Sequence, residues 1–135
     1  MTSPDLTFAS AVAARLLGHA RAGAPEEVCG VLGGDGERVT RSEAVPNVAS
    51  SPETRYELDP AATVEAIERV ERESEHLGFY HSHPRGPPRP SATDEAEATW
   101  TGFVYCIVSL PESRIDAWRW TGDRFEAVDV VVESA

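Results

Sequence analysis

The chain has 135 residues, of which 41% are hydrophobic, and this length and composition predict one domain over residues 1–135 with a hydrophobic core. The formal net charge of -11 argues against nucleic acids and anionic membrane surfaces as partners, because both attract clustered cations. No apolar run is long enough to span a membrane, and the first residues, MTSPDLTFAS, lack the pattern of a secretory signal, so we expect a cytoplasmic protein.

The basic residues are all of one type, since the 12 of them are Arg and the chain contains no Lys. An acidic excess without Lys is typical of the solvated surface of a halophilic protein, although a GC-rich genome would also favour Arg over Lys. The chain therefore also offers no side-chain amine of its own to which another protein could be conjugated.

The first half of the chain predicts a helix, a hairpin and a polar loop. Residues 9–21 carry apolar side chains at helical spacing. Residues 27–33 (EVCGVLG) predict a short buried strand, and 38–45 can pair back on it as a hairpin. The polar, turn-rich segment 46–54 follows, and 55–58 predicts a short strand.

A second helix begins at Asp59-Pro60, because Asp is a favoured N-cap and Pro suits the first helical position. We expect this helix to run to about His76, with Gly78 at its C-terminal cap. Its buried stripe is predicted to consist of Val64, Ile67 and Val70.

The second half of the chain predicts four more strands and a short helix. Residues 77–83 read as a strand that Pro84 stops, followed by a stiff Pro-rich loop over 85–90. A helix is expected from Ser91 to about Trp100. The last three predicted strands cover residues 103–110, 114–120 and 125–132. The sum is an α/β domain with a mixed sheet flanked by about three helices.

Candidate metal ligands lie at the end of the strand over residues 77–83. His81 and His83 are two residues apart, so both imidazoles project from the same face and can chelate one ion. Asp94 lies in the first turn of the next helix, which the short loop can fold back onto the strand end. Imidazole nitrogens with a carboxylate oxygen suit zinc, and three protein ligands leave a fourth position for water.

Each part of this pattern also has an ordinary structural reading. Ser91-x-x-Asp94 resembles a helix capping box, and the Pro-rich loop could be a plain linker or a polyproline segment. His19 and His76, which stand alone, are expected to be structural or surface residues. The metal site is indicated by the conjunction of His-x-His, a stiff loop, and Ser and Asp three residues apart.

The same residues resemble the signature of the JAMM (MPN-plus) zinc metalloproteases: His81-Ser82-His83-Pro84, followed by Ser91 and Asp94. That family also has an upstream catalytic Glu before a Cys-Gly pair, and Glu27 takes this position in EEVCGVLG, with Glu26 as the alternative. The resemblance implies a single MPN/JAMM domain with a curved mixed sheet, similar to the cytidine deaminase fold.

The resemblance further implies one zinc ion per chain, held by His81, His83 and Asp94. It assigns Glu27 as general base toward a metal-activated water, and Ser91 as hydrogen-bond donor to the developing oxyanion. The implied reaction is cleavage of an isopeptide or peptide bond after the C-terminal Gly-Gly of a ubiquitin-like modifier. The small size of the chain favours the stand-alone prokaryotic type, and its halophile-like composition favours an archaeal enzyme acting on small archaeal modifiers.

The segment 46–56 lies where members of this family guide the extended tail of the substrate. We expect it to offer an edge for β-augmentation, although an ordinary surface loop is a nearly equal alternative. The candidate substrate contacts in this segment are Pro46, Asn47, Thr54, Arg55 and Tyr56.

Other functions remain open from the sequence. Some relatives of this family trim sulfur-carrier proteins after Gly-Gly in cysteine or cofactor synthesis, and some MPN domains are non-catalytic scaffolds. A zinc deaminase would need a Pro-Cys-x-x-Cys ligand pair, which neither Cys29 nor Cys106 provides. Both cysteines lie in apolar stretches and are expected to be buried thiols. Trp118 and Trp120 are expected to share one strand face, as core residues rather than as a binding platform.

Overall fold

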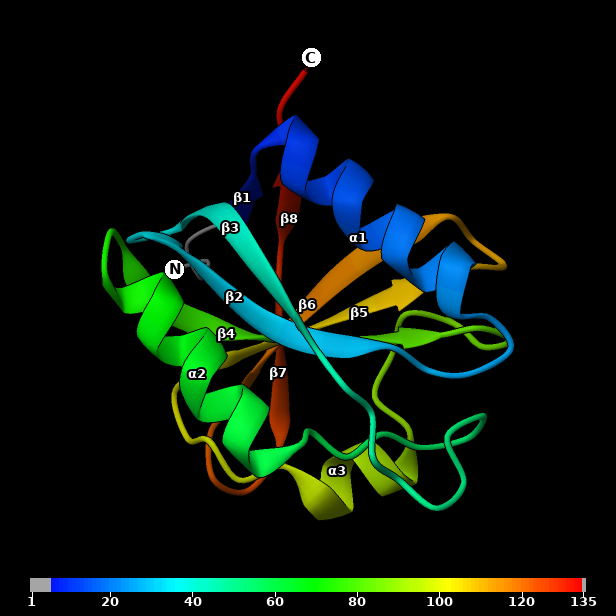
Figure 1. Cartoon of the computed structure of the whole chain (residues 1–135). Helices are drawn as coiled ribbons and strands as arrows, with labels where there is room; N and C mark the ends of the chain where they lie inside the picture. The colour runs from blue at the N-terminus through cyan, green and yellow to red at the C-terminus, as the bar shows by residue number, and fades with distance from the viewer. Residues whose placement is uncertain (1–5, 135) are drawn as a thin grey trace.

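The structure is a computed structural model that describes residues 6–134, so the two ends of the domain predicted over 1–135 lie outside the described residues. It confirms an α/β domain with one mixed sheet of eight strands and three helices (Figure 1). The helices are α1 (Ser10–Gly23), α2 (Pro60–Glu71) and α3 (Ala92–Glu97). The strands are β1 (Leu6–Phe8), β2 (Cys29–Asp35), β3 (Arg38–Val45), β4 (Glu75–His83), β5 (Val104–Ser109), β6 (Arg114–Trp120), β7 (Phe125–Val128) and β8 (Val130–Val132).

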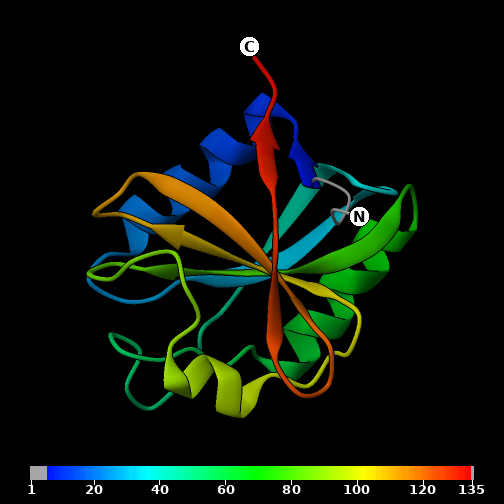
Figure 2. The same ribbon diagram turned by 180° about the vertical axis from the view of Figure 1, so that it is seen from behind.

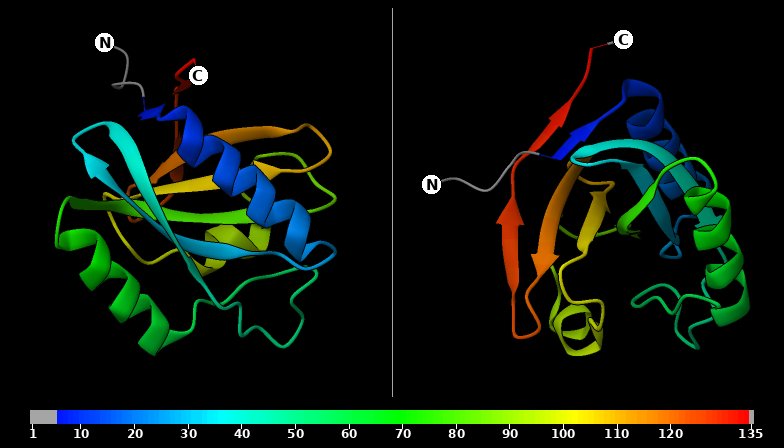
Figure 3. Two further views of the ribbon diagram at one scale, coloured as in Figure 1. Left: turned by 45° about the horizontal axis from the view of Figure 1, so that its top comes forward. Right: turned by 90° about the vertical axis from the view of Figure 1, so that its left-hand side faces the viewer.

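The sheet has the order β7-β6-β5-β4-β2-β3-β1-β8, so the last two strands of the chain lie at its opposite edges. Only Asp129 separates β7 from β8 in the sequence. The sheet must therefore curl until its two edges meet, and seen from behind β7 and β8 form one nearly continuous run (Figure 2). The deep curve is also visible in the right-hand view of Figure 3, with α3 beneath it.

Two hydrophobic cores cover the two faces of this sheet, and the alternation of side chains along β4 divides residues between them. Tyr80 belongs to the core that α1 closes, and Phe79 belongs to the core that α2 closes. Residues 78–83 of β4 are all buried, so the strand is covered on both faces and its polar residues His81, Ser82 and His83 lie inside the protein. His81 and His83 have the same parity as Phe79 and therefore lie on the α2 face.

The second helix differs from the prediction at both its end and its buried face. It ends at Glu71, where the Ser74 hydroxyl donates to the Val70 carbonyl at 2.7 Å and completes the last turn. Its buried residues are Ala66 and Val70, whereas Val64, predicted to be buried, is 56% exposed. The predicted cap residue Gly78 instead lies inside β4, where a side chain would overlap the backbone of Val104 in β5.

Several shorter segments were also predicted with wrong bounds or missed. The strand expected over 27–33 begins at Cys29, and 55–58 forms only an isolated bridge between Leu58 and Asn47. The helix after Ser91 ends at Glu97 instead of Trp100. Strand β1 was not predicted at all, because three residues are too few to show a periodic pattern. Within residues 6–134, no helix has the length and apolar character needed to cross a bilayer.

The close approach of β4 and β5 at Gly78 yields a stability prediction. Gly78→Ala is expected to lower the free energy of unfolding by about 1–3 kcal/mol or more, because the new methyl group overlaps a backbone carbonyl. Gly18→Ala is the matched control, since this helical glycine has no atom near the position of a Cβ and should gain roughly 0.5–1 kcal/mol. Urea unfolding of both variants measures the difference, and equal stabilities would contradict the prediction.

Candidate active site

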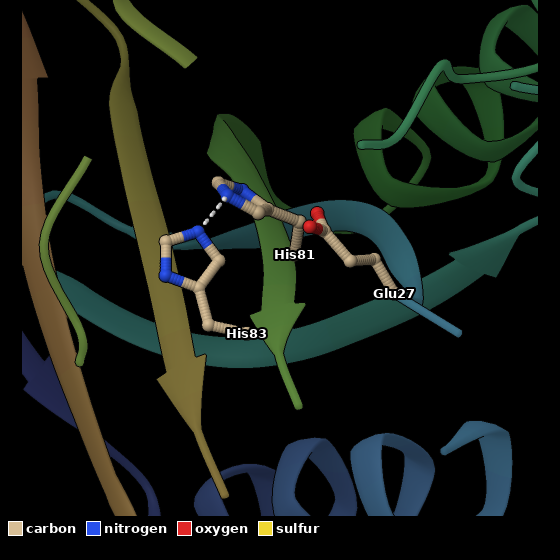
Figure 4. A group of neighbouring side chains, drawn as sticks. All are labelled: Glu27, His81 and His83. Atoms are coloured by element: carbon tan, nitrogen blue, oxygen red, sulfur yellow. Dashed lines mark hydrogen bonds between the residues drawn. The ribbon is translucent and has the colours of Figure 1, made fainter. Parts of the chain in front are cut away.

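The two histidines at the end of β4 bring their Nε2 atoms to 3.2 Å from each other (Figure 4). The neighbouring strands fix this strand end, since β2 pairs Cys29 opposite His81 and β5 pairs Ile107 with His81 on the other side. Both imidazoles are buried and lie on the face that α2 covers. The predicted chelating geometry of His81 and His83 is therefore present.

Asp94 completes this group from the first turn of α3. Its Oδ2 atom lies 3.2 Å from His81 Nε2 and 3.0 Å from His83 Nε2, and the carboxylate is buried. The capping box is also present: Asp94 N donates to Ser91 Oγ at 3.0 Å, and Ser91 N donates to Asp94 Oδ2 at 2.9 Å. The capping reading of Ser91-x-x-Asp94 is thus confirmed, and the cap aims the carboxylate at the two histidines.

Glu27 reaches the same place from the chain just before β2. Its neighbour Val28 is bonded to Ser82 in both directions, with Val28 N donating to Ser82 Oγ at 2.8 Å and Ser82 N donating to Val28 O at 3.0 Å. This register puts the Glu27 side chain on the face of His81 and His83, and a carboxylate oxygen lies within 4.8 Å of donor nitrogens of both. Glu26, the alternative, is exposed.

The Glu27 carboxylate is buried but incompletely bonded. Its Oε1 atom has no hydrogen-bond partner among the described residues. Burial raises the pKa of Glu27 to about 7, opposed by the charge of His83 and assisted by that of Asp94. An unpaired buried carboxyl is costly to a fold, so its retention beside a cluster of donor atoms indicates a chemical role.

The surroundings of His81, His83 and Asp94 shift the pKa values of the three side chains in different directions. Burial lowers the pKa of His81, which favours its neutral form. Burial opposes ionisation of Asp94, but hydrogen bonds from the two histidines outweigh it and lower the pKa of this carboxyl. Burial likewise opposes a charge on His83, but the contacts with Asp94 and Pro87 raise its pKa. The site therefore pairs an ionised carboxylate with two imidazoles.

The loop between β4 and α3 is held by three side chains that donate to three successive backbone carbonyls. Ser109 Oγ donates to Gly86 O at 2.7 Å, His83 Nδ1 lies 2.7 Å from Pro87 O, and Trp118 Nε1 donates to Pro88 O at 3.0 Å. Because a carbonyl can only accept, Nδ1 of His83 carries a proton, so Nε2 is the nitrogen that offers a lone pair whenever the ring is neutral. Sequence analysis missed Ser109, and Trp118 is more than a core residue.

The donor set fits a metal ion. In a tetrahedral zinc site with bonds of about 2.0–2.1 Å, ligand atoms stand about 3.3 Å apart. The separations of 3.0–3.2 Å among the donors of His81, His83 and Asp94 come close to this value. Three converging donors and a nearby buried carboxylate are the parts that metal-assisted hydrolysis requires.

A cavity of about 350 Å³ opens beside this group. Glu27, His83 and Ser91 line it, and so do Glu53 and Arg85, whose charged groups lie 3.4 Å apart. Its remaining lining residues are Thr54, Pro84, Gly86 and Pro87. The cavity therefore runs between the segment 46–58 and the Pro-rich loop, which gives a substrate access to Glu27 and His83.

The five predicted substrate contacts occupy different places. Pro46 is exposed away from the cavity lining, and Thr54 lines the cavity. The Arg55 guanidinium pairs with Glu97 of α3. Tyr56 stacks on His81, with ring centroids 4.2 Å apart and an angle of 19° between the planes. Asn47 points inward and bonds only to backbone atoms.

The remaining conspicuous residues are structural, as expected. His19 Nδ1 lies 2.8 Å from the Tyr80 hydroxyl on the α1 face, and His76 packs against aromatic rings that include Phe79. Both thiols are buried and free, and burial raises the pKa of Cys29 to about 12 and raises that of Cys106. Neither thiol is a nucleophile at neutral pH.

Comparison with known proteins agrees with this geometry. A family model that describes prokaryotic homologs of the JAB domain matches residues 9–121. The chain belongs to this family. The predicted JAMM/MPN resemblance and the single MPN domain are thereby confirmed.

Relatives of this JAB-family chain include proteins named as a desampylase and as a peptidase. It is 48% identical to the desampylase of Haloferax volcanii over 140 residues, which cover 98% of this chain and 100% of that protein. It is 35% identical over 97 residues to the CysO-cysteine peptidase of Mycobacterium tuberculosis, covering 70% of this chain and 66% of that protein. Among solved structures, protein DSY2949 from Desulfitobacterium hafniense has a TM-score of 0.85 at 30% identity, over 96% of this chain and 93% of that one.

The loop contacts yield a stability prediction for this JAB domain. Trp118→Phe keeps the ring but removes the donor to Pro88 O, so the free energy of unfolding should fall by about 0.5–1.5 kcal/mol. Trp100→Phe is the matched control, because Trp100 is 41% exposed and its indole nitrogen makes no hydrogen bond within residues 6–134. Urea unfolding that finds the two variants equally stable would show that the bond to Pro88 contributes nothing.

Proposed function

We propose that this chain is a zinc-dependent isopeptidase that cleaves after the C-terminal Gly-Gly of ubiquitin-like modifier proteins. The observation that carries the chemistry is the buried, unpaired carboxylate of Glu27 beside the donors of His81 and His83. The similarity to a desampylase along the full chain bears out the predicted JAMM-type isopeptidase. That relative comes from Haloferax volcanii, in agreement with the halophilic character predicted from composition.

Three donors would hold the metal: Nε2 of His81, Nε2 of His83 and Oδ2 of Asp94. Asp94 is preferred to Glu27 as third ligand, because its oxygen lies 3.0–3.2 Å from both imidazoles whereas Glu27 is only within 4.8 Å of them. Two nitrogens and one oxygen are a zinc-type set, and the hydrogen bond of His83 Nδ1 to Pro87 orients one ring. A zinc ion bound there supplies an activated water and polarises the scissile carbonyl.

Glu27 acts as general base in this proposal. Its oxygen without a hydrogen-bond partner accepts the proton of the attacking water, and the same carboxyl then passes that proton to the leaving amine. Its pKa near 7 suits both the acceptance and the release of a proton at neutral pH.

Ser91 supports the substrate carbonyl. Its oxygen already accepts from Asp94 N, while no acceptor for its hydroxyl proton is found within residues 6–134. The proton is therefore free to be donated to the oxygen on which negative charge develops. This arrangement gives Ser91 two functions, since the same side chain caps α3 and faces the cavity.

The modifier tail would enter the cavity between the segment 46–58 and the Pro-rich loop. Gly-Gly suits this place because a tail without side chains lets its backbone approach Glu27 and His83 closely. Of the predicted tail contacts, Thr54 faces the cavity and is retained. We keep the cytoplasm as the expected location and exclude nucleic acids and membranes as partners on charge.

A second substrate class is favoured by a specific likeness. The similarity to a CysO-cysteine peptidase supports trimming of a sulfur-carrier protein by the same chemistry. Parallel assays with lysine conjugates and with Cys-extended carriers distinguish the two substrates.

A non-catalytic scaffold is disfavoured, because all five predicted catalytic and metal-binding residues converge at one place. The sequence lacks the paired cysteines that a deaminase requires.

The deciding experiment incubates the purified protein with a Gly-Gly-terminated modifier joined to a lysine, with and without a chelator. Cleavage at the Gly-Gly junction is expected, and the chelator should abolish it. Glu27→Gln should retain stoichiometric zinc and lose about 10²–10⁴-fold in kcat, because the amide cannot accept the proton. Glu26→Gln is the matched control and should remain close to wild type, since this neighbour is exposed. A Glu27→Gln variant with full activity would refute the role of Glu27.

The ligand assignment has its own test. His81→Ala and Asp94→Ala should each lower the zinc content measured by elemental analysis of the purified protein, because two remaining donors hold zinc weakly. His19→Ala serves as the control, since this histidine bonds to Tyr80 on the other face of the sheet and should leave zinc stoichiometric. Stoichiometric zinc in both ligand variants would show that the ligand set is wrong.

A further inference from the structure

The side chain of Asn47 uses every hydrogen-bonding position of its amide within the protein. Its Nδ2 donates to Glu27 O at 2.9 Å and to Arg55 O at 3.1 Å. Its Oδ1 accepts from Ala49 N and from Glu57 N, both at 3.0 Å. Two donors and two acceptor positions are all that an Asn side chain has, so none is left for a substrate.

These partners connect the two halves of the proposed active site. Glu27 O belongs to the residue proposed as general base. Arg55 O and Glu57 N belong to the peptide groups on either side of Tyr56, whose ring stacks on His81 at 4.2 Å. The Asn47 amide therefore joins the backbone of Glu27 to the two peptide groups that flank Tyr56, and the Tyr56 ring packs on His81.

Backbone hydrogen bonds alone hold the segment 46–58 to Glu27 less firmly than they do together with Asn47. Val48 N donates to Glu57 O at 2.9 Å, and Asp59 N, just after the segment 46–58, donates to Pro46 O at 3.2 Å, so that these bonds close the segment on itself. A single backbone contact, from Glu27 N to Pro52 O at 2.7 Å, joins it to the base. Asn47 adds the second attachment on the other side of Glu27, and two attachments restrain rotation where one does not.

We propose that Asn47 is a positioning residue that sets the placement of Glu27 relative to His81, rather than a contact for the substrate tail. The proposal rests on the proposed function, in which Glu27 and His81 act on the same scissile bond. In this proposal the Asn47 side chain makes no contact with the substrate tail, because all of its hydrogen-bonding positions are used within the protein. The amide also has only one workable orientation, since Nδ2 faces two carbonyls and Oδ1 faces two N–H groups.

The test compares Asn47→Asp with Ser50→Ala, an exposed control in the same segment. Asn47→Asp keeps the size of the side chain but turns an oxygen toward the carbonyls of Glu27 and Arg55. With a Gly-Gly–lysine conjugate as substrate, kcat should fall by about 10- to 100-fold, as misplacement of a reacting group by about 1 Å does. KM should stay within about twofold, zinc should remain stoichiometric, and Ser50→Ala should match wild type.

Other outcomes overturn the proposal. A raised KM with unchanged kcat would make Asn47 a substrate contact, and unchanged kcat and KM would leave it only a structural role. Should Asn47→Asp fail to fold, Asn47→Ser removes the same bridge without adding charge and is held to the same expectation.

A readout independent of activity keeps this proposal separate from the proposed function. In the zinc-loaded protein, the Tyr56 ring should shift the His81 imidazole proton resonances upfield, and Tyr56→Leu calibrates the loss of that shift. Asn47→Asp should move these resonances toward the Tyr56→Leu values. If wild type fails to cleave any Gly-Gly conjugate, the proposed function fails. An unchanged His81 shift in Asn47→Asp would show that Asn47 does not hold Tyr56 on His81, which refutes the bridge from Glu27 to His81 in either case.

Discussion

The antiparallel pairing of β2 with β4 is the constraint on which the site depends. Side chains alternate along each strand, so a slip of one residue between these strands would turn Glu27 away from His81 and His83. The two hydrogen bonds between Val28 and Ser82 extend this register beyond the first residue of β2, as far as the neighbour of Glu27. Ser82, the middle residue of His-Ser-His, points to the opposite face from the two histidines, and this orientation lets it hold the chain that carries Glu27.

The hydrogen-bond partners of Asp94 offset the free-energy cost of burying its charge. A carboxylate in this position would be destabilising if it were unpaired. The capping box gives it a hydrogen bond from Ser91 N, and the two imidazoles provide the remaining partners. Because α3 is a short helix, its N-terminal cap is a large part of what fixes its position. The interaction that starts the helix and the one that completes the donor set are therefore the same.

The sequence predicted the parts of the site that follow from spacing. His-x-His on a strand and a Ser-x-x-Asp helix start specify directions of side chains, and the structure brings all five named residues together. The choice of Glu27 over Glu26 followed only from resemblance, since the parity that decides it belongs to the pairing with β4. Tyr56 and Asn47 lie in a segment without periodicity, so their neighbours depend on tertiary contacts that no local pattern encodes. The fold class was predictable, whereas the role of Gly78 depended on how closely β4 approaches β5.

The junction at Asp129 has a consequence for how the chain folds. Because β7 and β8 are consecutive but lie at opposite edges, the sheet closes only when β8 pairs with β1. Such closure joins the first and last segments of the described chain, a contact of high sequence separation that slows folding relative to a helical protein of the same length. Until it occurs, β1 exposes an unpaired backbone edge of the kind that recruits other chains. Pairing with β8 covers this edge of β1 and leaves only the three residues of β8 as the edge strand on that side of the sheet.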